Sequence, residues 1–522
     1  MLSMIRSSVR TGAAFLLVAT LLGVVRSAGA TAAQGGGRPN ILFVIADDWG
    51  WPHAGAYGAT WLKTPAFDRV ASEGVLFKNC FTSNPKCSPC RASILTGRNS
   101  WQTENAICHF GIFPKKWAVY PDLLEEAGYR VGFTGKGWGP GDFQSGGFTR
   151  NPAGPGFQAR KNPPPAGGIS NTDYAGNFND FLTAGDPSKP FCFWLGGQEP
   201  HRDYEPGSGM RAGKKPADVT VPSYLPDAAV TRNDMLDYAV EVEWFDTHLG
   251  RALKLLEARS QLDNTLIVVT SDHGMPFPRV KGQIYEHGFH VPLAVRWGSR
   301  VKSARTVNDF INVRDFAPTF LEAAGVTRPP SITGKSFLDV LLKPDSGWVD
   351  RSRNRMLIGK ERHDIGRPND WGYPVRAIRT PEYLYVHNYH PERWPVGNPE
   401  TNYPNCDNGP TKTFITFRFD DYYRLCFGYR PEEELYRVDE DSDCVKNLAG
   451  DPTLAAMKKQ LRTEMDTALK AEGDPRLNGN AAVFETYRYL GARTHAYDSW
   501  EKARGPAPVG TGAPGARTRR RR

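Results

Sequence analysis

The feature that most constrains this chain is the alternation of short apolar runs with amphipathic helical patterns between residues 39 and about 345. Four of the apolar runs are continuous, which is typical of strands that are buried on both faces of a parallel sheet. They cover residues 40–46, 130–134, 191–195 and 265–270. Helical patterns lie between them, at residues 64–73, 120–127 and 234–259. The order predicts an α/β sheet with helices on both faces.

From about residue 356 the pattern changes to short, aromatic-rich strands. The predicted strands include residues 375–379, 383–388 and 434–438, and a helix follows at 454–472. This pattern favours an α+β addition, in which a small antiparallel sheet packs against one helix. We therefore expect a large α/β domain over residues 38–355 and a C-terminal subdomain over residues 356–500.

The two ends of the chain differ from its body in composition. Arg6 and Arg10 precede the apolar run 13–25, and a small-residue cleavage site follows at 28–30. Residues 1–30 are therefore predicted to be a signal peptide, since the apolar run is too short to span a bilayer comfortably. Residues 505–522 are rich in Gly, Pro and Arg and are predicted to be a disordered basic tail. We expect an exported protein, periplasmic or secreted, without a membrane span.

Charge and cysteine content narrow the class of protein further. The formal net charge is +9, and the arginines of the two ends account for nearly all of it. The body is close to neutral, which argues against nucleic-acid binding. Among the eight cysteines, Cys406, Cys426 and Cys444 are close enough in sequence for one local disulfide. Cys87 and Cys90 form a Cys-x-x-Cys pair, but the matching second pair of a zinc site is absent.

Acidic side chains directly follow two of the predicted strands. Asp47 and Asp48 follow the first strand, and Asp272 and His273 follow the fourth. In open α/β sheets, ligands bind at the carboxyl ends of the strands. Carboxylate oxygens suit Ca²⁺ or Mg²⁺, so this edge of the sheet is a candidate metal site. The alternative is that these acids cap helices, which is common for one such turn and less so for two.

Residues 87–98 read Cys-Ser-Pro-Cys-Arg-Ala-Ser-Ile-Leu-Thr-Gly-Arg. Cys87, Pro89 and Arg91 form a Cys-x-Pro-x-Arg element, followed by a small-residue turn that ends at Gly97. This run resembles the signature of the type I sulfatases of the alkaline-phosphatase-like superfamily. Supporting runs are residues 40–48, 64–69, 135–136 and 271–274. The resemblance covers roughly residues 38–490 and is strongest to the heparan N-sulfatase branch, on residues 199–202, 272–278, 372–376 and 434–436.

The resemblance implies an alkaline-phosphatase-like sandwich with a large, mixed, mostly parallel sheet, and hydrolysis of sulfate groups from a sugar. Cys87 matches the residue that a formylglycine-generating enzyme converts to Cα-formylglycine, whose hydrated aldehyde attacks the sulfate. The residues that match the family's Ca²⁺ ligands are Asp47, Asp48, Cys87, Asp272 and His273. Arg91 matches the group that steadies the aldehyde hydrate. Lys136 and Lys281 match the cations that hold sulfate oxygens, and His201 matches the proton donor to the leaving group.

Two positions depart from the family pattern. His273 stands where the metal ligand is usually Asn, which exchanges an amide oxygen for an imidazole nitrogen. Trp138 stands where the family commonly has the histidine of a Lys-x-His pair. That histidine helps to remove a proton from the formylglycine hydrate, and an indole cannot take one. His109 and His53 are the candidates for a substitute.

Substrate choice is less determined by the sequence. His363 and Arg376, together with Glu361, Arg367 and the aromatic loop 389–394, are candidates to contact a sugar, and packing of the smaller sheet is an equal alternative. The expected substrate is an N-sulfated or O-sulfated sugar or polysaccharide. The alternatives are a phosphoester or phosphonate hydrolase of the same superfamily and a catalytically impaired protein that binds sulfated glycans. The sequence leaves a homodimer open.

Overall fold

A seven-stranded sheet forms the centre of the computed structural model, which describes residues 37–418 and 420–504. The strand order is β4-β6-β1-β7-β8-β2-β9. β8 runs antiparallel to both of its neighbours, β7 and β2, and the other neighbouring strands pair in parallel. The strands are β1 (Asn40–Ala46), β2 (Val75–Phe81), β4 (Arg130–Gly135), β6 (Phe191–Gly196), β7 (Thr265–Ser271), β8 (His290–Arg296) and β9 (Arg305–Asn312).

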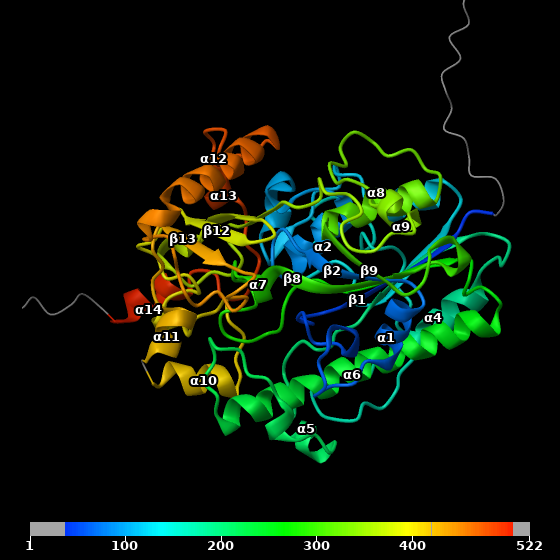
Figure 1. Ribbon diagram of the computed structural model, residues 1–522, viewed down its shortest axis with the longest axis horizontal. Coiled ribbons are helices and arrows are strands. Elements are labelled where there is room, and N and C mark those ends of the chain that lie inside the picture. Colours follow the sequence, from blue (N-terminus) through cyan, green and yellow to red (C-terminus); the bar gives the residue numbers. More distant parts are fainter. Residues whose placement is uncertain (1–36, 419, 505–522) are drawn as a thin grey trace, which may run out of the picture. The chain divides into compact units, whose positions relative to one another are not determined.

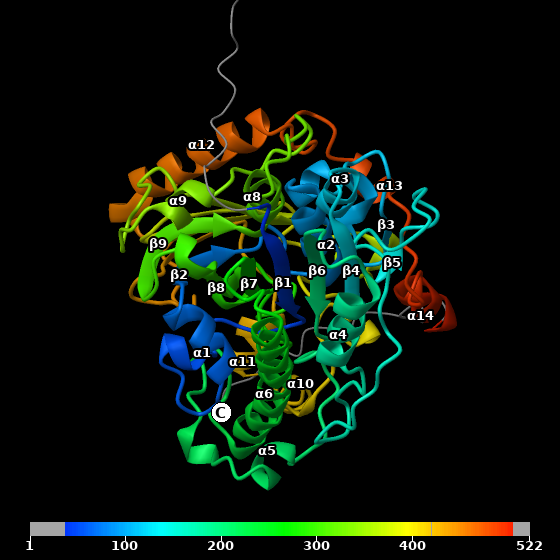
Figure 2. The same cartoon turned by 90° about the vertical axis from the view of Figure 1, so that its right-hand side faces the viewer.

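Helices cover both faces of this sheet (Figures 1 and 2). α1 (Pro65–Ser72), α4 (Tyr174–Ala184) and α6 (Ala229–Ala258) lie on one face. The other face carries α2 (Cys87–Thr96), α3 (Tyr120–Glu126), α8 (Phe316–Ala323) and α9 (Leu338–Leu342). Alternate residues of β1 join the two cores, since successive side chains of a strand point to opposite faces. This explains why β1 is apolar throughout.

A second, four-stranded antiparallel sheet follows in the chain, in the order β10-β11-β12-β13. Its strands are β10 (Met356–Lys360), β11 (Val375–Arg379), β12 (Tyr383–Asn388) and β13 (Glu433–Arg437). The helix α12 (Ala455–Ala471) buries Leu461, Met465 and Leu469 against one face of this sheet. These spacings of four residues place the three side chains on one side of the helix.

The remaining elements are short. They are β3 (Gly111–Ile112), β5 (Gly141–Asp142), α5 (Ser208–Arg211), α7 (Glu286–Phe289), α10 (Pro410–Thr416), α11 (Asp421–Phe427), α13 (Val483–Thr486) and α14 (Ala496–Arg504). Among the described residues, no helix combines the length and the apolar character needed to cross a bilayer. The expected signal peptide (1–30) and basic tail (505–522) lie outside the described residues.

The predicted fold class is confirmed, as an α/β sheet with helices on both faces and a smaller antiparallel sheet. Two local expectations are wrong. The segment between Arg91 and Gly97 is not a turn but part of the helix α2, whose C-cap Gly97 has the left-handed conformation that glycine adopts readily (φ 59°). All eight cysteines, each within the described residues, are free thiols. The local disulfide considered among Cys406, Cys426 and Cys444 is therefore not formed.

Candidate active site

The strands β1 and β7 are parallel neighbours, so the acids that follow them meet at one edge of the sheet. Asp47 and Asp48 directly follow β1, and Asp272 and His273 directly follow β7. Ligand atoms of Asp47, Asp48, Cys87 and His273 all lie within 4.8 Å of one another. Asp48 has a φ of 75°, a conformation that costs free energy in a non-glycine residue and is common at functional sites.

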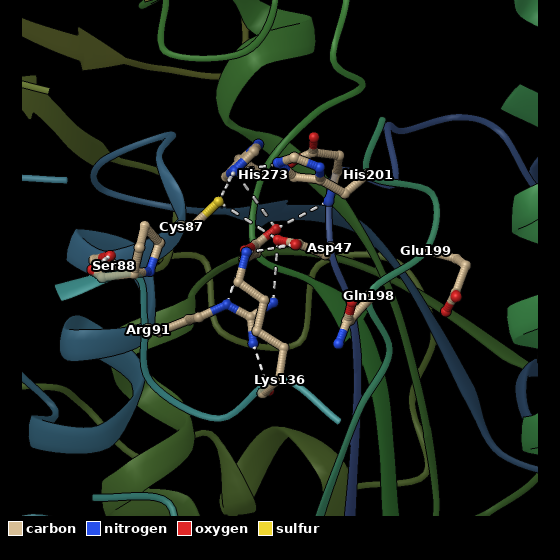
Figure 3. A network of polar contacts seen from close by, with 12 residues as sticks. Asp47, Cys87, Ser88, Arg91, Lys136, Gln198, Glu199, His201 and His273 are labelled. Atoms are coloured by element: carbon tan, nitrogen blue, oxygen red, sulfur yellow. Dashed lines mark hydrogen bonds and ion pairs between the residues drawn. The ribbon is translucent and has the colours of Figure 1, made fainter. Parts of the chain in front are cut away.

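Cys87 joins this cluster from the opposite direction, because it is the first residue of α2. Its Sγ lies 3.5 Å from Oδ1 of Asp47 and 3.4 Å from Nε2 of His273 (Figure 3). The side chain is fully buried, and burial raises the pKa of the thiol well above its usual value. The N-terminus of α2 carries a partial positive charge that favours an anion bound beside Cys87.

Arg91 lies one helical turn after Cys87 and contacts Asp47, which follows β1, and Asp272, which follows β7. Its Nη2 contacts Oδ1 of Asp47 at 3.3 Å, and its Nε donates to Oδ2 of Asp272 at 3.0 Å. Its Nη1 donates to the carbonyl oxygens of Lys136 and Gly137. Every group on this guanidinium is therefore used to position the site.

Asp272 lies beside the cluster of four ligand atoms rather than in it. Its Oδ1 accepts a hydrogen bond from the backbone N–H of Asp48, and its Oδ2 accepts from Arg91. Burial raises the pKa of Asp272. Burial acts in the same direction on Asp47, but the charges of Lys136 and Arg91 hold the pKa of Asp47 well below its usual value. Of these two carboxyl groups, Asp47 is the one whose charged form the surrounding cations favour.

Two lysines approach the acids from different elements. Lys136 follows β4, and its Nζ pairs with Oδ2 of Asp47. Lys281 lies between Asp48 and Asp407, and its Nζ is 2.7 Å from a carboxylate oxygen of each. Burial would lower the pKa of Lys281, yet the charges of Asp407 and Asp48 raise it well above its usual value. Both lysines are therefore cations in this site.

His201 follows β6 at the same edge of the sheet. Its Nδ1 is 2.6 Å from the carbonyl oxygen of Arg202, which fixes the ring and leaves Nε2 for another partner. The guanidinium of Arg202 is in turn held by both carboxylate oxygens of Asp234, at 2.7 and 2.8 Å. Ligand atoms of His201 also lie close to Asp48 and Asp407, so the leaving-group candidate and the acid cluster form one site.

The donor set fits a hard divalent cation. Oδ1 of Asp48 is buried and has no hydrogen-bond partner among the described residues, although Nε2 of His273 is only 3.1 Å away. Two potential ligand atoms thus face each other without a donor between them, as expected where a cation completes the arrangement. The carboxylates of Asp47 and Asp48 supply oxygen ligands, and His273 adds one nitrogen.

A cavity of about 960 Å³ opens over this site. Asp47, Lys136 and His201 line it, whereas Cys87 and Lys281 lie behind its wall. Its other walls include aromatic side chains and charged groups, most of them from segments between the strands. Those walls include Phe110, Phe133, Trp138, Tyr489, Lys86, Asp364, Glu199, Glu241 and Arg493. A cavity of this volume accommodates a sugar-sized ligand.

Trp138 lies in the cavity wall beside the start of α2. Its indole Nε1 donates to the carbonyl oxygen of Ser88 at 3.1 Å, so the ring supports the helix turn that carries Cys87. Of the two candidate substitutes, His109 lines the cavity, and its Nδ1 is 2.8 Å from Asp364. His53 does not line it; it is buried against Tyr238, 3.1 Å from the phenol oxygen.

Arg376 and His363, which we expected to meet a sugar, do not line the cavity. Arg376 is fully buried, and its guanidinium pairs with Glu361 and Asp474. His363 is also buried, and its Nε2 contacts Oδ1 of Asn84. The alternative that the sequence left open, packing within the protein, fits both residues, although Nδ1 of His363 has no hydrogen-bond partner among the described residues.

Sequence reasoning missed three charged residues of the site. Asp407 lies in a long loop, far from any strand end, so its partnership with Lys281 had no local signal. Lys86 pairs with Asp364 at 2.7 Å, and both line the cavity. The position of Lys86, directly before Cys87, was the one signal that could have been read.

This arrangement of buried carboxylates, cations and a cavity suits a hydrolase that acts on a tetrahedral oxyanion. The family described as Sulfatase matches residues 39–326, and the chain belongs to this family. The family described as N-sulphoglucosamine sulphohydrolase, C-terminal, matches residues 277–396. The resemblance read from the sequence is therefore confirmed, and the chain is a sulfuric ester hydrolase by family.

Several curated relatives are similar over most of the chain. N-sulphoglucosamine sulphohydrolase from Homo sapiens is 28% identical over 478 residues, covering 82% of this chain and 89% of the relative. An ulvan-active sulfatase from Formosa agariphila is 27% identical over 449 residues, covering 84% and 81%. N-acetylglucosamine-6-O-sulfatase from Bacteroides thetaiotaomicron is 26% identical and covers 67% and 79%.

Solved structures share the fold at lower identity. One, in complex with its substrate D-glucosamine-2-N,6-O-disulfate, has a TM-score of 0.60 and 22% identity and covers 84% of this chain and 98% of its own. The phosphonate monoester hydrolase of Agrobacterium radiobacter has a TM-score of 0.61 and 19% identity, covering 83% and 96%. The expected alkaline-phosphatase-like fold is confirmed by these likenesses.

Proposed function

We propose that this chain removes sulfate from an N-sulfated glucosamine of a sulfated glycan, using formylglycine made from Cys87 and a bound Ca²⁺. The observation that carries the proposal is the position of Cys87. It begins α2 in a Cys-x-Pro-x-Arg element, and its Sγ contacts both Asp47 and His273 of the acid cluster. The N-sulfate is preferred over an O-sulfate because the C-terminal match and one relative both carry the N-sulphoglucosamine sulphohydrolase description.

Formylglycine would supply a hydrated aldehyde as the nucleophile, and Ca²⁺ would supply positive charge at the sulfate oxygens. Asp47, Asp48, Cys87 and His273 are the residues that would hold the cation, with Asp272 beside them. Arg91 keeps Asp47 and Asp272 in place through its two ion pairs.

The other residues of the site have separable roles. Lys136 reaches the cavity with its ammonium group and binds a sulfate oxygen. Lys281 neutralises Asp48 and Asp407 from behind the wall and supports the charge balance of the sulfate pocket. His201 presents Nε2 to the leaving nitrogen, because its Nδ1 is engaged by the carbonyl oxygen of Arg202.

The test is mass spectrometry of the peptide that contains Cys87, after co-expression with a formylglycine-generating enzyme. We expect the mass loss for exchange of the thiol by an aldehyde, together with release of sulfate from N-sulfoglucosamine. An intact thiol with undiminished sulfate release would overturn the nucleophile. Release from 6-O-sulfated but not from N-sulfated glucosamine would overturn the substrate.

One observation favours a second candidate, a protein that binds sulfated glycans without turnover. Trp138 occupies the wall of the cavity where a proton-accepting histidine is expected, and its ring nitrogen donates to Ser88. Hydrolysis of aryl sulfate by the matured protein excludes this candidate. Hydrolysis of aryl phosphate at an equal or higher rate would instead favour phosphoester chemistry.

A further inference from the structure

The long helix α6 carries four buried acids, and three of them have clear partners. Asp234 binds the guanidinium of Arg202. Asp237 accepts hydrogen bonds from the backbone N–H groups of Gly207 and Gly209. Asp246 accepts from the backbone N–H groups of two residues at the start of α1. These acids are structural, because each joins α6 to a neighbouring segment.

Glu241, the fourth acid, differs from them. Its side chain belongs to a residue that is 2% exposed, and neither carboxylate oxygen has a hydrogen-bond partner among the described residues. Leaving a buried carboxyl group without a donor costs free energy, so such groups are rare in proteins unless they have another use. Glu241 lines the same cavity as Lys136 and His201. Glu241 therefore belongs to the wall of the substrate cavity, with a carboxyl group that is unpaired among the described residues.

The polar groups around Glu241 do not supply a hydrogen-bond donor to its carboxyl oxygens. The carboxylate of Glu199 is itself occupied, because it accepts from the backbone N–H of Ser170 and the hydroxyl of Tyr174. The guanidinium of Arg202 donates from both Nη atoms to the carboxylate of Asp234 and from Nε to the carbonyl oxygen of Pro276. Asp203 adds a further acid to the cavity wall. This part of the wall is thus rich in acceptors and lacks a donor for Glu241.

We propose that Glu241 binds the amino nitrogen of a glucosamine residue, on the side of the cavity where the sulfate's leaving group departs. This inference rests on the proposed function and names the residue that recognises the amino nitrogen of the sugar. The nitrogen of N-sulfoglucosamine carries an N–H, and after loss of sulfate it becomes an ammonium group. Both forms donate to an oxygen of the Glu241 carboxyl group, and a bound ammonium group favours the ionised carboxylate through a charge-assisted hydrogen bond. A neutral hydroxyl gains less from a wall that holds Glu199, Asp203 and Glu241 together.

The test measures binding of D-glucosamine and N-acetyl-D-glucosamine by isothermal titration calorimetry. The acetylated sugar keeps the ring, its hydroxyls and one N–H but has no basic nitrogen. The side-chain oxygen of Gln accepts from that N–H as Glu241 does, so only the charged amino group distinguishes the two sugars. We expect Glu241→Gln to weaken D-glucosamine binding about tenfold or more and to change N-acetyl-D-glucosamine binding by less than about twofold. Glu241→Met, which also removes the acceptor, should weaken D-glucosamine at least as strongly.

The control is Glu243→Gln on the same helix, because Glu243 pairs with Lys214 and does not line the cavity. It should leave the affinity for both sugars unchanged. Equal losses for the two sugars in Glu241→Gln would overturn the inference, since Glu241 would then contact a shared hydroxyl. Unchanged binding in both Glu241 variants would overturn it as well.

The Cys87→Ala variant separates this inference from the proposed function. It should bind D-glucosamine like the unchanged protein, because Glu241 does not depend on formylglycine. If the matured protein releases no sulfate but binds D-glucosamine through Glu241, the proposed function fails and the inference stands. If it releases sulfate from N-sulfoglucosamine while Glu241→Gln binds D-glucosamine normally, the inference fails alone.

Discussion

Arg376 has a structural role that can be tested, because the sequence allowed either contact with a sugar or packing of the smaller sheet, and its charged group lies in the interior. The Arg376 guanidinium donates to Asp474 at 2.6 and 3.1 Å and pairs with Glu361 at 2.8 Å. It also donates to the backbone carbonyl oxygens of Lys360 and Val375. The ring of Trp101 lies 5.4 Å from its central carbon.

The change we consider is Arg376→Ala. Glu361 keeps Arg476 as a partner, but Asp474 is left with one backbone N–H, from Arg476, on a side chain that is fully buried. Removing one partner of a buried ion pair destabilises a protein by about 3–5 kcal/mol. That loss is a large part of a typical unfolding free energy of about 5–15 kcal/mol.

The assay is guanidinium unfolding of the purified protein, followed by fluorescence. The matched control is Arg355→Ala, because Arg355 pairs with Glu464 at the surface. Both of these side chains are more than a third exposed. We expect the control to lose less than about 1 kcal/mol. A loss in Arg376→Ala no larger than in the control, together with a raised KM for a sulfated sugar, would refute the structural role.

Three further predictions concern the site. Cys87→Ala should abolish sulfate release while the far-ultraviolet circular dichroism spectrum stays unchanged. Cys87→Ser should also be inactive when it is matured by an enzyme that acts on cysteine. Normal turnover in Cys87→Ala would contradict the assignment of Cys87 as the nucleophile. Treatment with a chelator should lower both the sulfatase activity and the midpoint of thermal unfolding, and Ca²⁺ should restore both better than Mg²⁺. Full activity without divalent cations would exclude a role of a metal in the reaction. Burial and the charge of Glu199 raise the pKa of Glu241 to about 9, so the folded protein keeps a proton there that the unfolded chain loses above about pH 4.5. Ionisation of Glu241 therefore opposes folding increasingly from about pH 4.5 to 9, and Glu241→Gln should raise the thermal midpoint more at about pH 8 than at about pH 5; equal shifts at both pH values would contradict this.

Much of the fold was readable because its signals are local. The apolar runs that became β1, β6 and β7 lie inside the sheet and are buried throughout, so they lack the alternation of a half-exposed strand. The strands β2, β8 and β9 were not predicted. β2 is partly exposed and irregular in register, so it lacks the continuous burial of a central parallel strand.

The helix α2 was misread for a related reason. Its residues are small and polar, with Pro89 near its start, and every one of them is buried. A buried helix has no amphipathic pattern, and its small side chains suggested a turn instead. Tertiary packing, rather than intrinsic preference, holds Cys87 and Arg91 one helical turn apart.

The sequence by itself determined which residues follow the parallel strands, and therefore that Asp47, Asp48, Lys136, His201 and His273 gather at one edge of the sheet. This follows because parallel strands share their carboxyl ends. Only the tertiary structure decided which distant charges meet. It paired Lys281 with Asp407 and placed Arg376 in the interior. It also left Glu241, in the cavity wall, without a hydrogen-bond partner in the part of the chain that the structure describes. The physical reason is that burial and pairing depend on segments far apart in the chain, and a charge carries no local sign of the partner it will have.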